Sequence, residues 1–84
     1  MKNYTVVLQD AIAGKKQVDI SCKVLNESVI KREFKKIAGD VTKWLLFGTA
    51  SVDITDNETG AIIAEGNWAC NVFAGQSNYN IKLI

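Results

Sequence analysis

The sequence predicts an α+β domain, in which an antiparallel sheet of about five strands carries one helix on one face. Two segments that alternate apolar and polar residues come first, then a segment whose apolar residues recur every three or four positions, then three more alternating segments. Alternation is the period of a half-buried strand, and the longer recurrence is that of a helix. The expected order is therefore strand, strand, helix, strand, strand, strand. With 84 residues and 48% hydrophobic content, residues 1–84 are expected to form a single domain.

The first two strands are expected over residues 4–9 and 17–24. In the first strand, the alternating residues Tyr4, Val6 and Leu8 are apolar and fall on one face. The second strand has the same pattern at Val18, Ile20, Cys22 and Val24. The residues between them, 10–16, include Gly14 and two lysines, so a hairpin with a longer loop is predicted.

The helix is expected from about residue 27 to residue 38. Asn26 is a favourable N-cap, and Glu27 places a negative charge in the first turn. The apolar positions at helical spacing are Ile30, Phe34, Ile37, Ala38 and Val41. Gly39 offers a C-terminal cap, but the spacing continues to Leu45, so a continuation or a separate turn to about residue 46 is a second interpretation. In a third, Trp44 to Phe47 begin the next strand.

The stretch DITDNETGAIIAEGNW, residues 53–68, has the composition of either a cation-binding loop or a tight turn. A calcium loop of the EF-hand type needs glycine at its sixth position and glutamate at its twelfth. Neither residue is in place when the loop is started at Asp53 or at Asp56. Alternation over 50–55 and 62–72 instead predicts two strands joined by a turn at 56–60. Asp56 would accept a backbone N–H and Gly60 would adopt positive φ, and no metal site is expected.

A last strand is expected over residues 78–84, after a loop that covers residues 75–78. The helix is expected to pack Ile30, Phe34 and Ile37 against strand residues that include Ile20, Val52 and Trp68. Phe73 is expected in the core as well. Isolated cysteines behave as small apolar residues, so Cys22 and Cys70 are expected to be buried free thiols rather than a bridge. No stretch is long and apolar enough for a membrane span, and the first residues do not resemble a signal peptide, so a cytoplasmic location without membrane association is expected.

Catalytic motifs are missing from the sequence, so we expect a protein that is not an enzyme and uses no cofactor. The chain has no histidine, which is the commonest general base near neutral pH. It also contains no GxSxG, P-loop or GxGxxG pattern. Asp53 and Glu65 can meet across the second hairpin, but such pairs are common on solvated sheet faces.

Charge is distributed unevenly along the chain. Residues 1–43 hold nine basic and five acidic residues, whereas residues 44–84 hold one basic and four acidic residues. The expected partner-binding residues lie on the helix: Lys31, Arg32, Lys35, Lys36 and Lys43. Like charges four residues apart repel on a helix surface, which favours a negatively charged partner, although a merely solvated face is the alternative. In that case the exposed sheet face near Ile63, Glu65 and Asn67 is the next candidate.

Three kinds of partner fit these observations. The sequence has no aromatic motif of the RNA-binding type, and its isoelectric point near 7.7 is low for a nucleic-acid-binding domain. A protein partner, such as a component of a nucleic-acid-binding complex, is therefore preferred to direct nucleic-acid binding by the same helix. A structural protein that forms a homodimer through an exposed strand edge is the third hypothesis.

The layout of the chain resembles small accessory proteins of bacteriophages and mobile elements, including compact α+β inhibitors of the anti-CRISPR kind. The likeness lies in the short length, in the single helix NESVIKREFKKIAG between strand groups, and in the hairpin VDITDNETGAIIAEG. It covers the whole chain and assigns no role to any residue. It implies a non-catalytic inhibitor of a host defence or nucleic-acid-processing complex, which acts by covering a surface of its partner.

Overall fold

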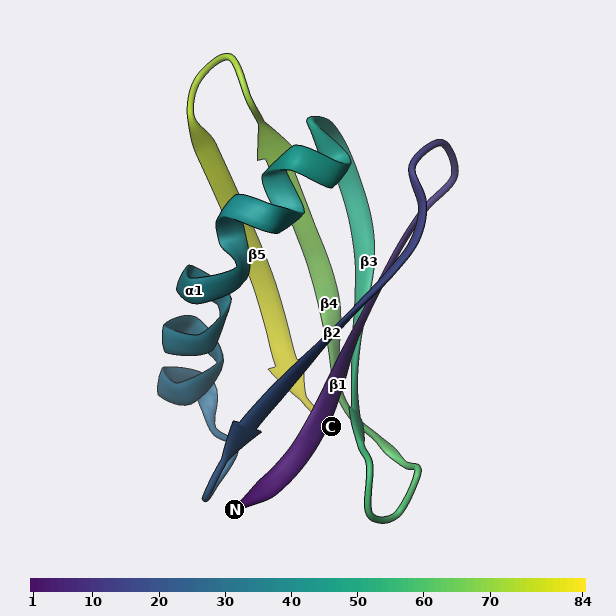
Figure 1. Ribbon diagram of the computed structural model, residues 1–84, viewed down its shortest axis with the longest axis vertical. Coiled ribbons are helices and arrows are strands. Elements are labelled where there is room, and N and C mark those ends of the chain that lie inside the picture. Colours follow the sequence, from purple (N-terminus) through teal and green to yellow (C-terminus); the bar gives the residue numbers. More distant parts are fainter.

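One antiparallel sheet and one helix form the fold, in the order that the sequence predicts (Figure 1). The computed structural model describes residues 1–84 except the side chain of Phe47. The elements are β1 (Lys2–Asp10), β2 (Gly14–Cys22), α1 (Glu27–Leu45), β3 (Phe47–Asp56), β4 (Ile62–Asn71) and β5 (Gln76–Leu83). The predicted α+β class, with its strand and helix order, is confirmed.

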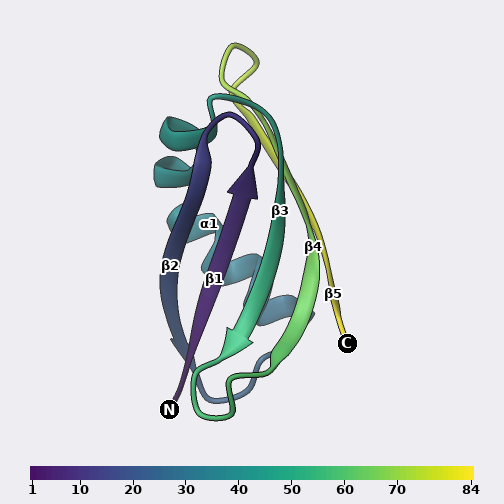
Figure 2. The ribbon, with the colours of Figure 1, turned by 90° about the vertical axis from the view of Figure 1, so that its right-hand side faces the viewer.

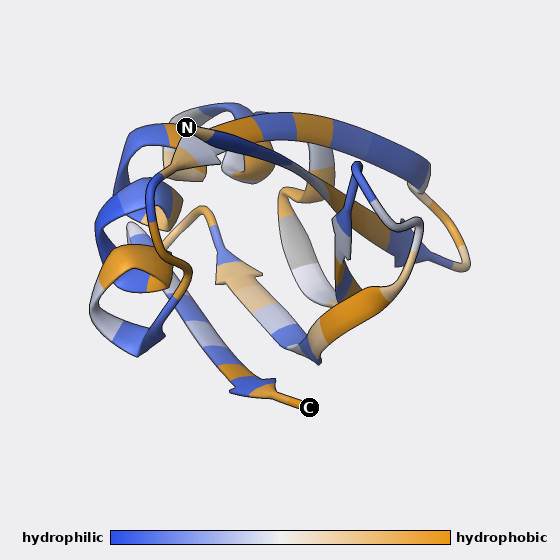
Figure 3. Cartoon of the chain, turned by 90° about the horizontal axis from the view of Figure 1, so that it is seen from below, coloured by the Kyte–Doolittle hydropathy of each residue, from blue (hydrophilic) through white to orange (hydrophobic). Residues whose placement is uncertain are grey.

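The strands lie in the spatial order β2-β1-β3-β4-β5, and every neighbouring pair is antiparallel. Strands β2 and β3 both flank β1, so α1 connects them by crossing that strand. Figure 2 shows the five strands in this order with α1 behind them. Seen from below, the sheet curves around the helix (Figure 3). One face of the sheet is therefore covered by α1, and the other faces solvent.

The core lies between α1 and the covered face of the sheet. Phe34 is fully buried and stacks on Trp68 with ring centroids 4.8 Å apart. Tyr79 of β5 meets Phe34 edge-on at 5.1 Å. Ile20 and Val52 are also buried, as predicted. Offset stacked and edge-on aromatic pairs add roughly 0.5–1.5 kcal/mol to the hydrophobic gain of burial, so this cluster fixes α1 to β4 and β5.

The first hairpin has a short turn, and the prediction of a longer loop is wrong. Only residues 11–13 separate the strands. The Asp10 carboxylate accepts hydrogen bonds from the backbone N–H groups of Ile12 (2.9 Å) and Ala13 (2.8 Å). These bonds lower the pKa of the Asp10 carboxyl. Because β2 ends at Cys22, Val24 lies beyond the strand and is exposed rather than inward-facing.

Helix α1 continues without interruption to Leu45, so Gly39 does not end it and the next strand does not begin at Trp44. Val41 and Leu45 are buried against the sheet, and their burial outweighs the roughly 1 kcal/mol that a glycine costs inside a helix. At the other end, the Asn26 side chain accepts a hydrogen bond from the Val29 N–H at 2.9 Å, which confirms the predicted N-cap.

The acidic loop between β3 and β4 is a tight turn, as predicted. The Asp56 carboxylate accepts the Glu58 N–H at 2.9 Å, the Asp56 carbonyl accepts the Gly60 N–H at 2.7 Å, and Gly60 has φ 77°. A register shift between Ile54 and Thr55 locally disturbs the pairing of β3 with β4. Ile62 beside it is exposed instead of facing the core.

The β4–β5 connection lies earlier in the chain than predicted, over residues 72–75, because β5 begins at Gln76. Strand β4 ends at Asn71, so Val72 and Phe73 belong to the turn and are exposed. The prediction that Phe73 lies in the core is therefore wrong. Cys22 and Cys70 are buried free thiols, as expected.

Within the part of the chain that the structure describes, no helix has the combined length and apolar character that crossing a lipid bilayer requires.

Candidate functional site

Five cationic side chains form the basic face of α1, which we define as Lys31, Arg32, Lys35, Lys36 and Lys43. All five are exposed. Helical spacing places four of them on the side away from the buried residues Ile30, Phe34 and Val41, and it places Lys31 at the flank next to β5. The first four lie within two turns, whereas Lys43 lies in the last turn, about 10 Å further along the axis at 1.5 Å per residue. The structure thus brings four of the five predicted residues together and places the fifth at one end.

Glu33 neutralises two cations of the basic face from the buried side of the helix. It is only 8% exposed, and its carboxylate lies 3.4 Å from both Arg32 and Lys36. Ion pairs between exposed cations and a nearly buried carboxylate are stronger than fully solvated pairs, because solvent screens them less. Arg32 and Lys36 therefore hold a carboxylate of their own chain and are less available to a partner.

The remaining cations of the basic face have no such partner. Among the residues that the structure describes, Lys31, Lys35 and Lys43 form no ion pair. Lys31 borders β5, because its backbone carbonyl accepts a hydrogen bond from the Tyr79 hydroxyl at 3.3 Å. These three lysines therefore present the part of the basic face that no carboxylate of the described residues holds in an ion pair.

The burial of Glu33 is not predicted above, because this residue lies among the cations of the segment IKREFKK. A signal exists in the sequence, because Glu33 lies three residues after Ile30 and four before Ile37, both of which face the sheet. Glu33 therefore lies at the edge of the helix face that contacts the sheet.

Cys22 lies near Arg32, Glu33 and Lys36. Its thiol is poorly suited to nucleophilic chemistry. Burial raises the pKa of the Cys22 thiol, and the nearby Glu33 carboxylate raises it further, against a smaller opposing effect of Arg32. The thiolate is the reactive form, so the neutral thiol predominates near pH 7. On the other side of the core, the Cys70 sulfur lies among hydroxyl groups, 3.7 Å from Ser77 and 3.9 Å from Thr42.

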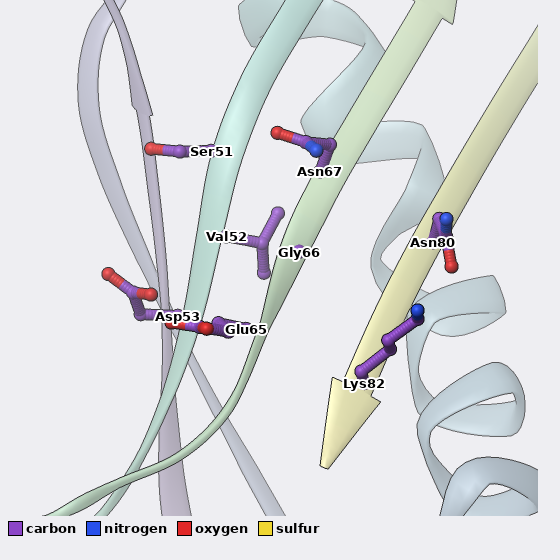
Figure 4. Close-up of a pocket in the computed structure, with 8 residues that line it drawn as sticks. All are labelled: Ser51, Val52, Asp53, Glu65, Gly66, Asn67, Asn80 and Lys82. Carbon is purple, nitrogen blue, oxygen red and sulfur yellow. The ribbon is translucent and has the colours of Figure 1, made fainter. Parts of the chain in front are cut away.

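The open face of the sheet carries a second group of predicted residues. Asp53 and Glu65 are directly opposite in the β3–β4 register, and Lys82 is opposite Glu65 in the β4–β5 register. With Asn67 they line a hollow of about 440 Å³ (Figure 4). Glu65 and Asn67 are exposed, and Asp53 is half-buried.

Ile63, the third residue predicted on this face, is half-buried. Of the paired carboxylates, Glu65 is exposed and Asp53 is only half-buried, whereas a site that tunes carboxylates for proton transfer usually desolvates them. This hollow therefore ranks below the basic face as a functional candidate.

The basic face is an exposed array of charge on a rigid helix, an arrangement that suits docking against an oppositely charged surface. Comparisons with protein-family models, with curated proteins and with solved structures found no match for this chain.

Proposed function

We propose that this chain is a non-catalytic binding protein whose basic face of α1 docks against an acidic surface of a partner protein. The observation that carries this proposal is the set of three exposed lysines, Lys31, Lys35 and Lys43, on one side of α1 without an ion pair among the described residues. Repulsion between Lys31 and Lys35, one helical turn apart, disfavours the free helix slightly. A partner's carboxylates relieve that repulsion and steer the encounter.

A narrower form of the proposal follows from the layout. Its resemblance to inhibitors of bacteriophages and mobile elements supports an inhibitor that covers part of a host defence or nucleic-acid-processing complex in the cytoplasm. Occlusion needs a rigid surface and no reacting group, and α1 is held against the sheet by the stacked rings of Phe34 and Trp68.

A protein surface suits the basic face better than a nucleic acid does. Proteins that bind single strands place aromatic rings beside the basic track so that bases stack on them. Here Trp68 is fully buried, and Tyr79 is half-buried with its hydroxyl bonded to the helix backbone. The net charge of the whole chain is only +1, so little long-range attraction for polyanions is expected.

The test removes the charge of these three lysines and leaves the ion pairs of Glu33 in place. The variant Lys31→Gln/Lys35→Gln/Lys43→Gln keeps side-chain length and helix propensity. A matched control, Lys2→Gln/Lys15→Gln/Lys23→Gln, makes the same charge change at exposed positions outside α1. Substitution of Arg32 and Lys36 is avoided, because it would remove both cationic partners of the mostly buried Glu33 carboxylate and could destabilise the fold itself.

Both variants and the wild type are used as affinity baits in extract from the native host, and captured proteins are quantified. A protein bound by the wild type and the control, but lost from the α1 variant mainly through slower association, supports the proposal. Binding to random-sequence duplex DNA and single-stranded RNA is measured in parallel. Strong binding at physiological salt, with a salt slope that falls by roughly one per removed lysine, would instead establish a nucleic-acid partner. If the α1 variant still binds every ligand of the wild type, the basic face is only a solvated surface and the proposal is refuted.

A further inference from the structure

A groove lies between the N-terminal half of α1 and strand β5. Its volume is about 330 Å³, and it is lined by Glu27, Ile30 and Lys31 from the helix and by residues 79–82 from the strand. Figure 1 shows the N-terminal half of α1 running beside β5. Its lining is mixed, and the apolar part comes from Ile30, which is buried, and from Ile81, which packs against the core. Lys31 lines the groove from the helix, next to the Glu27 carboxylate, and Lys82 lines it from β5, where the strand register places Lys82 opposite Glu65 on the open face of the sheet.

One side of this groove is an open edge of the sheet. In the described part of the chain, β5 pairs with β4 and with no other strand. Alternate residues of an antiparallel edge strand direct their N–H and C=O groups away from the sheet, where another strand can bind them. Proteins usually block such edges with charge, proline or bulges.

A helix beside the edge is another protection, and α1 lies beside β5 with the groove between them. Strand β5 lacks the other three protections. Lys82 is its only charged residue, the chain contains no proline, and the β4–β5 register runs without a shift from residue 76 to residue 83. The opposite edge strand, β2, carries three charged residues, Lys15, Lys16 and Asp19. The two edges thus differ, and the edge with fewer charges is the one beside the groove.

We propose that the groove and the β5 edge together accept an extended segment of a partner protein, which adds to the sheet as an additional strand. Strand addition derives affinity from main-chain hydrogen bonds and specificity from pockets for alternate side chains. On the α1 side of the added strand, an apolar side chain would lie over Ile30 and Ile81 and an acidic one would approach Lys31. On the open-face side, an acidic side chain would approach Lys82. The inference rests on the proposed function and deepens it, because Lys31 belongs both to the basic face and to the groove.

Charge argues against a second copy of the chain in this place. Antiparallel pairing of β5 with the β5 of another copy would place both α1 helices on the same face of the joined sheet. Lys31 and Lys35 of the two copies would then approach one another, and like charges at an interface are unfavourable. A partner segment with acidic side chains would instead place negative charges beside these lysines, which is favourable.

The experiment first selects binders from a random-sequence peptide library displayed on phage, with the wild-type protein as the target. Enriched sequences are expected to combine an acidic residue with apolar residues at alternate positions. Each selected peptide is then synthesised, and hydrogen exchange of the protein's amides is measured by NMR with and without it. Strand addition protects alternate amides of β5, whereas docking of side chains on the outer face of α1 leaves them unchanged.

Charge reversal provides the matched variants. Lys31→Glu/Lys82→Glu is expected to weaken peptide binding at least about tenfold, equivalent to about 1.4 kcal/mol. Lys15→Glu/Lys23→Glu carries the same charge change at exposed positions away from the groove and is expected to bind like the wild type. A library that yields no binder, binders that protect no β5 amide, or equal affinities of the two variants would overturn the inference. Sedimentation of the free protein as a dimer with protected β5 amides would overturn it in favour of self-pairing.

A third variant separates this inference from the proposed function. Lys35→Gln/Lys43→Gln changes the basic face and leaves every residue of the groove intact. If it loses the partner protein but still binds the selected peptides, both statements hold. If the wild type captures a partner and no peptide engages β5, only the groove inference fails. If peptides engage β5 and the Lys35→Gln/Lys43→Gln variant binds the partner as the wild type does, the groove inference holds. The proposal that Lys35 and Lys43 contact the partner then fails.

Discussion

The substitution Gly66→Ala is expected to destabilise the domain through a collision with β5. Gly66 pairs with Val52 on one side and with Ile81 on the other. A Cβ atom at this position would overlap the Asn80 carbonyl oxygen and lie 2.8 Å from both the Asn80 carbonyl carbon and the Ile81 Cα. These are backbone atoms, so no side-chain rotation can relieve the contact and β5 itself must move.

The expected magnitude follows from measurements of overpacking, which typically costs 1–3 kcal/mol when backbone shifts are needed. We therefore expect the free energy of unfolding to fall by about 1–3 kcal/mol. In a domain of this length, each kcal/mol corresponds to roughly 4–8 °C in melting temperature, so Tm should fall by at least about 4 °C. Displacement of β5 would also disturb the groove beside α1.

Gly39→Ala is the matched control, because it makes the same chemical change with the opposite expected sign. A Cβ at Gly39 meets nothing within 4 Å, and the residue lies inside α1. Alanine is favoured over glycine there by about 1 kcal/mol, so Tm should rise. Urea and thermal unfolding are followed by circular dichroism. A Gly66→Ala variant as stable as the wild type, or a Gly39→Ala variant less stable than Gly66→Ala, would refute this reasoning.

Three further outcomes are expected. Asn26→Ala removes the N-cap of α1 and should lower the free energy of unfolding by about 1 kcal/mol in urea denaturation, whereas an unchanged midpoint would mean that the cap is dispensable. The amide NMR signals of Ile12 and Ala13 should titrate with the Asp10 carboxyl at a pKa below the ordinary aspartate range, because both N–H groups bind its ionised form; a midpoint above that range would contradict the turn geometry. Because burial raises the pKa of the Cys22 thiol, its alkylation in the folded protein should require a higher pH than in urea, and equal rates in the two states would show an accessible thiolate.

Local signals in the sequence predicted the elements well, and tertiary packing decided their limits. The Asn26 cap and the Asp56–Gly60 turn involve residues near one another in the chain, so both were predictable. Gly39 marked a possible helix end, but the burial of Val41 and Leu45 extends α1 beyond it. That burial depends on the sheet beneath and cannot be evaluated from the helix sequence alone.

The candidate site was predictable only in part, for a related reason. Exposure of Lys31 and Lys35 follows from helical periodicity, but the burial of Glu33 depends on how α1 lies against the sheet. The groove beside β5 was not predictable, because nothing local indicates that β5 forms an edge while β1 and β3 are central. Phe73 was placed in the core by its residue type, although β4 ends two residues earlier and leaves it in a turn.

The aromatic cluster of Phe34, Trp68 and Tyr79 gives the molecule an internal optical reporter. Trp68 is fully buried and lies within 5 Å of both other rings by centroid distance, so its near-ultraviolet circular dichroism should be strong and sensitive to small rotations. Tyr79 belongs both to this cluster and to the groove. Occupation of the groove should therefore change the spectrum without any label. With Trp44→Phe as background, all tryptophan fluorescence comes from Trp68, and the same signal follows binding in real time.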